Sequence, residues 1–226
     1  MAEFDPEQLQ PLERYKLMGG SIVPRPIGWV STVSASGDVN LAPFSYCNAV
    51  SAHPMCVQFC PANKPDGSMK DTLANALPEV EGGTGEFVLN IVSEPLVQQM
   101  AATAEPLPPA ENEFTFAGLD PASSVNVAPP RVANAMVAFE CRTMHVIQLA
   151  KGEPAGGNLV LGEVVYVHTA DGLVNERFHV DAAMLAAVGR MGGLDYATTR
   201  HRFTLPAGSK ALEHPSPLAE PASDRA

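Results

Sequence analysis

The residues best suited to binding a ligand lie between predicted strands in the N-terminal quarter of the chain. Small and hydrogen-bonding side chains stand there where a plain sheet would carry valine and isoleucine: Asn40, Ala42, Pro43, Ser45, Tyr46 and Asn48. Such residues leave backbone groups open to a bound molecule. A Pro-interrupted edge strand is the alternative interpretation of the same pattern.

A second group of polar residues is formed by Lys70, Asp71 and Thr72. The sequence predicts a short helix over 70–77 that ends at Pro78. A helix start binds anions through unpaired N–H groups and the helix dipole, and a lysine adds a point charge. The alternative is an ordinary capped helix with a solvated lysine.

No grouping of side chains in the sequence performs chemistry unaided. No nucleophile stands beside a base, and no carboxylates pair in a strong motif. The four cysteines form no Cys-x-x-Cys pair, and no histidine stands at ligand spacing, so we expect reduced thiols and no metal site. The chemistry must therefore come from a bound group, and catalytic residues stay unknown.

The net charge limits the classes of partner. Fourteen basic and 25 acidic residues give a net charge of −11, which disfavours nucleic acid and anionic membranes. An anionic ligand would need local positive charge from Arg25, Lys64 or Lys70. No long apolar run and no signal peptide are present, so we expect a soluble, cytoplasmic protein.

The pattern of strands and turns predicts a mainly β fold. Alternation predicts strands over 27–34, 46–50, 55–59, 86–92, 135–150 and 159–169. Short helices are expected over 6–18, 70–77, 94–104 and 181–188. Because strands joined by tight turns outnumber helices and no βαβ alternation occurs, we expect a six-stranded antiparallel Greek-key barrel with short flanking helices.

The length suits one domain over 1–205, followed by a Pro/Ala-rich tail over 206–226. The tail has little to bury, so we expect it to be flexible or packed on a partner subunit. Six prolines exclude long regular structure over 105–131, which we interpret as a lid or a dimer-facing excursion. Gly19 and Gly20 are expected to end the first helix.

Several strings in order resemble a known family. RPIGWVST, NLAPFSYCNAVSAHP, the KDT of residues 70–72, GEFVLNIV and GRMGGLDY resemble the flavin reductase-like family of FMN-binding split barrels. The resemblance extends from about Pro24 to Phe203. It implies a split barrel that binds FMN, uses NADH or NADPH, and forms a homodimer whose interface completes two flavin sites.

The resemblance also assigns cofactor-binding residues. The positions that match the family are, beside the flavin, Arg25, Trp29, Ser31 and Thr32; along the ring, Ala42, Pro43, Phe44, Ser45, Tyr46 and Asn48; at the phosphate and ribityl end, Lys70, Asp71 and Thr72; and in a C-terminal loop, Arg190 and Tyr196. Asn158 stands where related short-chain flavin reductases often carry a histidine.

Two classes of function follow from the resemblance. The first is an NAD(P)H-dependent flavin reductase that supplies reduced flavin to a monooxygenase or reduces a small acceptor. The second is an FMN electron carrier, similar to flavoredoxin, that is fed by a protein partner. A catalytically silent flavin or ligand sensor is a third possibility. Since the flavin carries the reaction, no side-chain acid is required.

Overall fold

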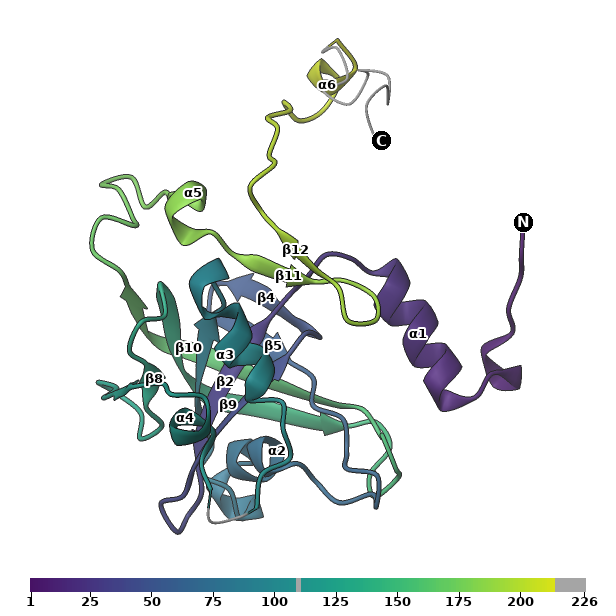
Figure 1. Cartoon of the computed structure of the whole chain (residues 1–226), viewed down its shortest axis with the longest axis vertical. Coiled ribbons are helices and arrows are strands. Elements are labelled where there is room, and N and C mark those ends of the chain that lie inside the picture. The colour runs from purple at the N-terminus through teal and green to yellow at the C-terminus, as the bar shows by residue number, and fades with distance from the viewer. Residues whose placement is uncertain (109–110, 214–226) are drawn as a thin grey trace.

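The main element of the protein is an antiparallel sheet of seven strands, seen in a computed structural model that describes residues 1–108 and 111–213 (Figure 1). The strands are β2 (Gly28–Val33), β3 (Val39–Phe44), β4 (Cys47–Ala52), β5 (Met55–Phe59), β6 (Glu86–Ile91), β9 (Val137–Gln148) and β10 (Asn158–Thr169). Their order across the sheet is β3-β2-β6-β9-β10-β5-β4.

Short elements surround this sheet. Two smaller sheets consist of β1 (Arg25–Pro26) with β11 (Val188–Arg190) and β12 (Tyr196–Thr198), and of β7 (Pro121–Ala122) with β8 (Arg131–Val132). The helices are α1 (Pro11–Ser21), α2 (Asp71–Ala76), α3 (Val97–Ala102), α4 (Glu113–Phe116), α5 (Ala182–Leu185) and α6 (Lys210–Glu213), with 3-10 turns at Pro6–Gln8, Glu79–Glu81 and Glu94–Leu96. The predicted mainly β class with short helices is confirmed.

The two edges of the large sheet are consecutive in the chain. Only Ser45 and Tyr46 separate β3 from β4, although these strands lie at opposite ends of the strand order. The sheet must therefore curl, and its edges pack together: a Cβ added to Gly28 on β2 would lie 2.8 Å from Sγ of Cys47 on β4. No strand ladder joins β3 to β4 within the described residues, so closure of the barrel by hydrogen bonds is not seen.

The sequence predicts six strands, and the sheet has seven because Val39–Phe44 forms a strand of its own. This strand pairs with β2 along its whole length, with Pro43 opposite Trp29. Proline is tolerated there because β3 is an edge strand, where a missing N–H breaks no ladder. Pro43 thus lies on an edge strand without interrupting it.

The long pair β9 and β10 confirms the two clearest predicted strands. These strands pair antiparallel, with irregularities between Leu161 and Gly162 and between Val164 and Tyr166. Gly162 is required because a Cβ there would lie 2.4 Å from the ring of Phe87 on β6. The close packing of that ring against the backbone helps to bend the sheet.

The hydrophobic core has two parts on opposite faces of β2. Val30 lies in the first, inside the curled sheet, where Phe59 packs at 5.2 Å from Phe44 and 5.1 Å from Phe87 between ring centroids. Trp29 lies in the second, with residues of α3, α4 and β8. Both faces of β2 are buried, which fixes its position in the fold.

Helix α1 differs from the prediction because it continues through Gly19 and Gly20 to Ser21. The two glycines do not end the helix, and the close approach here depends on Gly192, where a Cβ would lie 3.2 Å from the Cα of Gly20. Figure 1 shows α1 projecting from the body of the molecule.

The C-terminal segment also differs from the prediction. Asp181 caps α5 as expected, accepting from the N–H groups of Ala183 and Met184, but the helix ends at Leu185. The glycine-rich stretch over 189–196 forms the β11–β12 hairpin instead of a plain loop, because β11 pairs with β1. Of the expected tail, residues 214–226 lie outside the described residues. No helix in the described part of the chain is long and apolar enough to cross a membrane.

Candidate functional site

Arg25 joins three segments that are distant in the sequence. Its guanidinium donates to the carbonyl oxygens of Gly19 and of Ile22 (3.0 Å) at the end of α1, and to that of Met191 (3.0 Å) in the β11–β12 hairpin. Its Nε donates to Ser45 Oγ at 3.3 Å. Arg25 is 5% exposed, and no carboxylate within the described residues pairs with it. Its positive charge is therefore held by carbonyl and hydroxyl oxygens and not by a carboxylate.

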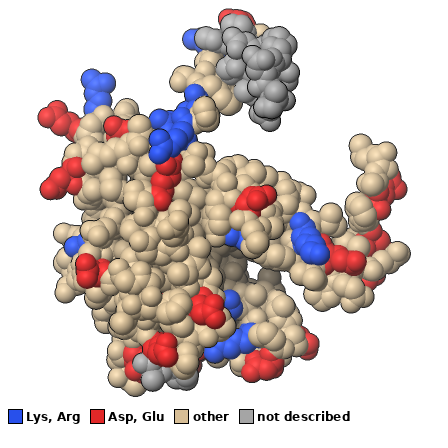
Figure 2. Space-filling model, viewed as in Figure 1, with Lys and Arg blue, Asp and Glu red and all other residues tan. Residues whose placement is uncertain are grey.

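Tyr46 lies beneath this guanidinium. The Arg25 Cζ stands 5.6 Å from the centre of the Tyr46 ring, and the ring of Tyr15 from α1 stacks on Tyr46 at 6.4 Å. Burial raises the pKa of the Tyr46 hydroxyl, against the opposite effect of Arg25. The β3–β4 link and α1 are thus held together. Figure 2 shows an opening between α1 and the body, with Lys and Arg side chains along its lower edge.

The predicted site residues on β2 point in two directions, because successive side chains of a strand alternate between faces. Trp29 Nε1 donates to Thr103 Oγ1 at 2.8 Å, and Ser31 donates to the carbonyl of Pro130. Both face the Pro-rich excursion. Thr32 faces α2 on the other side. All three are fully buried, so the structure does not bring them together on one ligand-binding surface.

A small polar network fastens α2 to β2 and β3. Asn40 Nδ2 donates to Thr72 Oγ1 at 2.8 Å and lies 3.5 Å from Thr32 Oγ1. Asn75 Nδ2 donates to Thr32 Oγ1 at 3.0 Å. Thr72 is 1% exposed, so its hydroxyl faces the protein interior. The network thereby fixes the first turn of α2 against the sheet.

Lys70 precedes this turn and remains exposed. Its Nζ lies 6.0 Å from the centre of the Phe44 ring, which is itself buried. Lys64, by contrast, is paired with Asp71 through an Nζ–Oδ1 distance of 2.9 Å. Lys70 makes no ion pair within the described residues, and it is therefore the cation at this end of β3 that is available to an anion.

The predicted ring segment runs along the edge of the sheet. Ala42, Pro43, Ser45 and Tyr46 are half-buried, and Asn48 is exposed on β4. Arg190 and Tyr196 lie on the two strands of the β11–β12 hairpin, with the Arg190 Cζ 4.5 Å from the Tyr196 ring centre. The Arg25–Met191 contact connects this hairpin to Ser45, so the structure brings these segments together.

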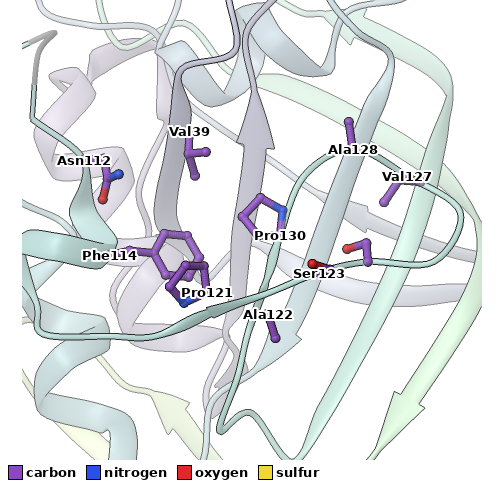
Figure 3. A pocket seen from close by; sticks show the side chains of 10 residues that line it. Val39, Asn112, Phe114, Pro121, Ala122, Ser123, Val127, Ala128 and Pro130 are labelled. Carbon is purple, nitrogen blue, oxygen red and sulfur yellow. The ribbon is translucent and has the colours of Figure 1, made fainter.

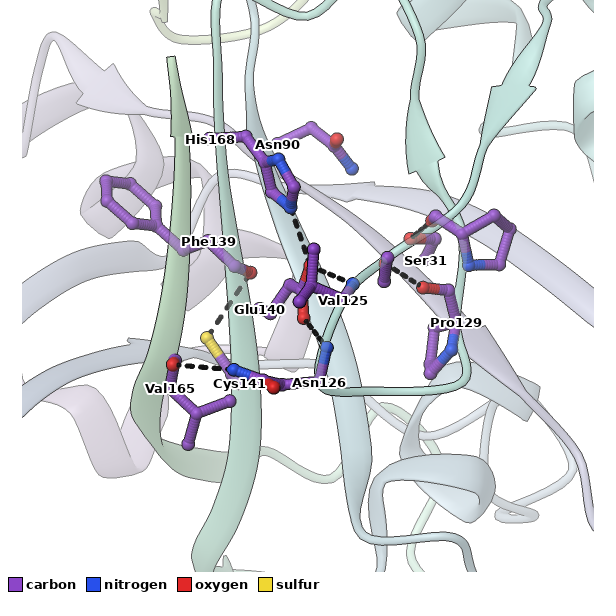
Figure 4. A network of polar contacts seen from close by, with 12 residues as sticks. Ser31, Asn90, Val125, Asn126, Pro129, Phe139, Glu140, Cys141, Val165 and His168 are labelled. Carbon is purple, nitrogen blue, oxygen red and sulfur yellow. Dashed lines mark hydrogen bonds and ion pairs between the residues drawn. The ribbon is translucent and has the colours of Figure 1, made fainter.

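Figure 4 shows a buried carboxylate that the sequence analysis missed. Glu140 is fully buried and accepts from His168 Nε2 (2.6 Å) and from the N–H groups of Val125 (2.7 Å) and Asn126 (2.6 Å). Burial acts to raise the pKa of Glu140, but these hydrogen bonds outweigh it and the pKa is lowered. The pair anchors the excursion to β9. The glutamate within the apolar run VAFEC is the sequence feature that could have indicated this buried carboxylate.

One pocket lies in the excursion. It has a volume of about 370 Å³, and it is lined by Val39, Asn112, Phe114 and residues over 121–130 (Figure 3). None of the fifteen predicted cofactor-binding residues lines it. Its wall carries no ionisable side chain. The pocket and the predicted site are therefore separate features of the molecule.

Asn158 and the cysteines are structural. Asn158 is 1% exposed and donates to Pro61 O (3.0 Å), Asn63 Oδ1 (2.9 Å) and Gly156 O (3.2 Å), which ties two loops together. Burial raises the pKa of the Cys47 thiol to about 12 and that of Cys141 well above its usual value. No metal-binding group of three or more His, Cys, Asp or Glu residues occurs in the described part.

The residues present fit a flavin mononucleotide. A phosphate dianion needs a cation in a chain of net charge −11, and exposed, unpaired Lys70 provides one. The ring needs a half-open strand edge, and Ala42 to Tyr46 provides it beside the uncompensated charge of Arg25. The two features are adjacent because Phe44 lies within the same segment.

Comparisons with known proteins identify the family of the chain. The family model described as "Flavin reductase like domain" matches residues 18–192. An uncharacterized protein of Aquifex aeolicus (strain VF5) is 38% identical over 80% of this chain and 88% of its own length.

Two solved structures are similar over nearly the whole chain. Nitrilotriacetate monooxygenase component B from Bacillus cereus has a TM-score of 0.83 and 34% identity, covering 91% of this chain and 98% of that one. The 2-nitrobenzoate 2-nitroreductase NbaA of Pseudomonas fluorescens has a TM-score of 0.80 and 27% identity, covering 92% and 97%.

Proposed function

The chain belongs to the flavin reductase-like domain family, and from this membership we propose that it is an FMN-binding oxidoreductase. It takes electrons from NADH or NADPH in the cytoplasm, and it supplies reduced flavin to a monooxygenase or reduces a small acceptor. Similarity to a monooxygenase component B and to a nitroreductase supports these two uses of the electrons. The flavin site belongs to a single domain over 1–205.

One observation carries this proposal most strongly: two cations flank the segment expected to hold the flavin. The Arg25 Cζ lies 5.6 Å from the ring centre of Tyr46, and Lys70 Nζ lies 6.0 Å from that of Phe44. Neither forms an ion pair within the described residues. In an acidic protein, two uncompensated cations beside one strand end favour an anionic ligand.

The residues divide into contact and support roles. Lys70 and Asp71 lie at the phosphate and ribityl end, and the main chain from Ala42 to Tyr46, with Asn48, lies along the ring. Thr72, Trp29, Ser31 and Thr32 are buried and hold the surrounding strands and helix in place. A bound flavin accepts a hydride and passes electrons on, so the protein needs to supply only binding and orientation.

We further propose a two-fold homodimer that completes the flavin sites, with Arg190 and Tyr196 approaching the cofactor. Large apolar side chains are exposed on projecting α1, at Leu12, Tyr15 and Met18, and on β4 and β9, at Val50 and Ile147. Exposed large apolar side chains of this kind favour a subunit contact. Sedimentation at micromolar concentration checks this, and a monomer that retains FMN would contradict it.

A flavoredoxin-like electron carrier is the second candidate. It is favoured by the orientation of Asn158, which occupies the position of a frequent histidine but points into the protein. A carrier receives electrons from a protein partner, so it needs no nicotinamide site.

Titration of the apoprotein with FMN, FAD and riboflavin tests the binding step. We expect FMN to bind more tightly than riboflavin, because Lys70 contributes only when a phosphate is present. Equal affinity for FMN and riboflavin would show that the phosphate does not lie beside Lys70. Absence of binding to all three flavins would refute the proposed function.

A further inference from the structure

The network beneath Lys70 contains one residue that neither the resemblance nor the comparisons assign. Asn40 is half-buried on β3 and reaches across to α2, where its Nδ2 donates to Thr72 Oγ1 at 2.8 Å. Thr72 is 1% exposed, so this contact lies under the surface that carries Lys70. Asn40 can therefore influence the position of Lys70 through Thr72. The buried Thr72 hydroxyl itself does not face a ligand.

The bond from Asn40 is the only side-chain hydrogen bond that Thr72 makes within residues 1–108 and 111–213. Helix α2 begins at Asp71, and the side chain of its N-cap residue, Lys70, makes no capping hydrogen bond. A six-residue helix without such a cap has little stability of its own, so its first turn takes its position from tertiary contacts. Asn40 supplies one of these, from the same strand that carries Phe44.

The rest of the helix is held separately. Asn75, one turn further on, donates to Thr32 Oγ1 at 3.0 Å, and its carbonyl accepts from Thr84 Oγ1 at 3.1 Å. Leu73 and Ala76 are fully buried in the core. Loss of the Asn40 contact would thus loosen the first turn while the body of α2 remains packed.

We propose that Asn40 is a positioning residue for the phosphate of FMN. It acts through Thr72, by holding the Lys70–Thr72 turn against β3 so that the Lys70 ammonium stays beside Phe44. This inference rests on the proposed function, because it requires Lys70 to meet the phosphate. It predicts selectivity: weakening this turn reduces affinity for FMN and leaves affinity for riboflavin, which lacks a phosphate, unchanged.

The test compares the dissociation constants of FMN and riboflavin in matched variants. Asn40→Ala should weaken FMN binding about tenfold and riboflavin binding less than about twofold. Asn75→Ala is the control, because it removes a hydrogen bond from the same helix and network but not from Thr72. It should leave the ratio of the two constants unchanged within about twofold, even if it lowers the melting temperature.

A double-mutant cycle tests the route through Thr72. Thr72→Val keeps the shape of the side chain and removes the acceptor, so it should raise the FMN dissociation constant relative to that of riboflavin as much as Asn40→Ala does. The double variant should be no worse than Thr72→Val alone. If Asn40→Ala does not fold, Asn40→Leu keeps the approximate size of the residue and removes the donor without adding a charge, so it should give the same selective loss.

Three results are decisive. The inference is overturned if Asn40→Ala or Asn40→Leu affects FMN and riboflavin equally while Lys70→Ala weakens FMN alone; the proposed function then stands. It is also overturned if Asn75→Ala gives the same selective loss as Asn40→Ala. If Lys70→Ala leaves the ratio unchanged, the phosphate lies elsewhere, and the proposed site fails together with the role of Asn40.

Discussion

Lys70→Ala should weaken FMN binding and leave riboflavin binding nearly unchanged. The exposed ammonium of Lys70 lies 6.0 Å from the Phe44 ring centre and has no ion-pair partner within the described residues. Its charge is therefore available to a phosphate. Riboflavin shares the ring and the ribityl chain with FMN but lacks the phosphate, so it reports on everything in the site except this contact.

The size of the effect follows from the exposure of Lys70. Two unit charges 4 Å apart interact with about 1 kcal/mol in bulk water and about 4 kcal/mol near a protein surface. Because Lys70 is exposed, solvent screens part of this interaction, and we expect a loss of about 1 to 3 kcal/mol, equivalent to about 5- to 150-fold in the dissociation constant. The loss should shrink at 1 M salt, where the Debye length falls to about 3 Å.

The assay is fluorescence titration of FMN and riboflavin at low and high salt. Lys210→Ala is the charge-matched control, because α6 lies at the opposite end of the molecule from α2 (Figure 1). It should change neither affinity by more than about twofold. Equal weakening of FMN and riboflavin by Lys70→Ala would show that Lys70 acts through folding or through the ring, and would refute the placement of the phosphate.

Three further predictions concern stability, access and rate. Glu140→Gln should lower the free energy of unfolding in urea by about 2 to 4 kcal/mol, because a buried N–H of the excursion loses its anionic acceptor. Because the pKa of Glu140 is lowered in the folded protein, its ionised form contributes stability above the usual carboxyl pKa of about 4.3. This contribution is lost as the pH falls below that value. In Glu140→Gln, the loss of stability on acidification should therefore be smaller. Ser45→Trp should abolish FMN binding while the far-UV circular dichroism stays unchanged. Retained binding would show that the flavin ring does not lie at the β3–β4 link. Asn158→Ala, His53→Ala and His145→Ala should each change the rate of hydride transfer by less than about tenfold, about 1.4 kcal/mol, with FMN still bound; a loss of several orders of magnitude would reveal a missed acid or base.

The strands with strong alternation could be predicted from the sequence. β9 and β10 carry long apolar runs between turn residues, and they form as expected. β3 was hidden because Asn40 and Pro43 interrupt its pattern, and what allows a strand there is its place at the sheet edge, which is a tertiary property. Gly19 and Gly20 likewise look like a helix stop, but α1 continues to Ser21, and Gly192 of the β11–β12 hairpin packs close to Gly20.

The sequence motifs of the candidate site could be recognised, but most of its three-dimensional arrangement could not be predicted. The string RPIGWVST places Trp29 and Thr32 near each other in sequence, but a strand sends them to opposite faces, as the two-residue period already implies. The meeting of Arg25 with Ser45 and Met191 could not be predicted, because it depends on the curl of the sheet and on the β11–β12 hairpin. Glu140 escaped notice because two of its three partners, Val125 and Asn126, lie in an irregular loop.

Anaerobic addition of NADH or NADPH to the FMN-loaded protein tests the central claim most directly. The proposed reductase should bleach the visible flavin absorbance with one equivalent of at least one nicotinamide, at a rate that saturates with nicotinamide concentration. Dithionite provides the control for a reducible flavin. Bleaching by dithionite but by neither nicotinamide would contradict the reductase and leave the electron carrier as the function of this protein.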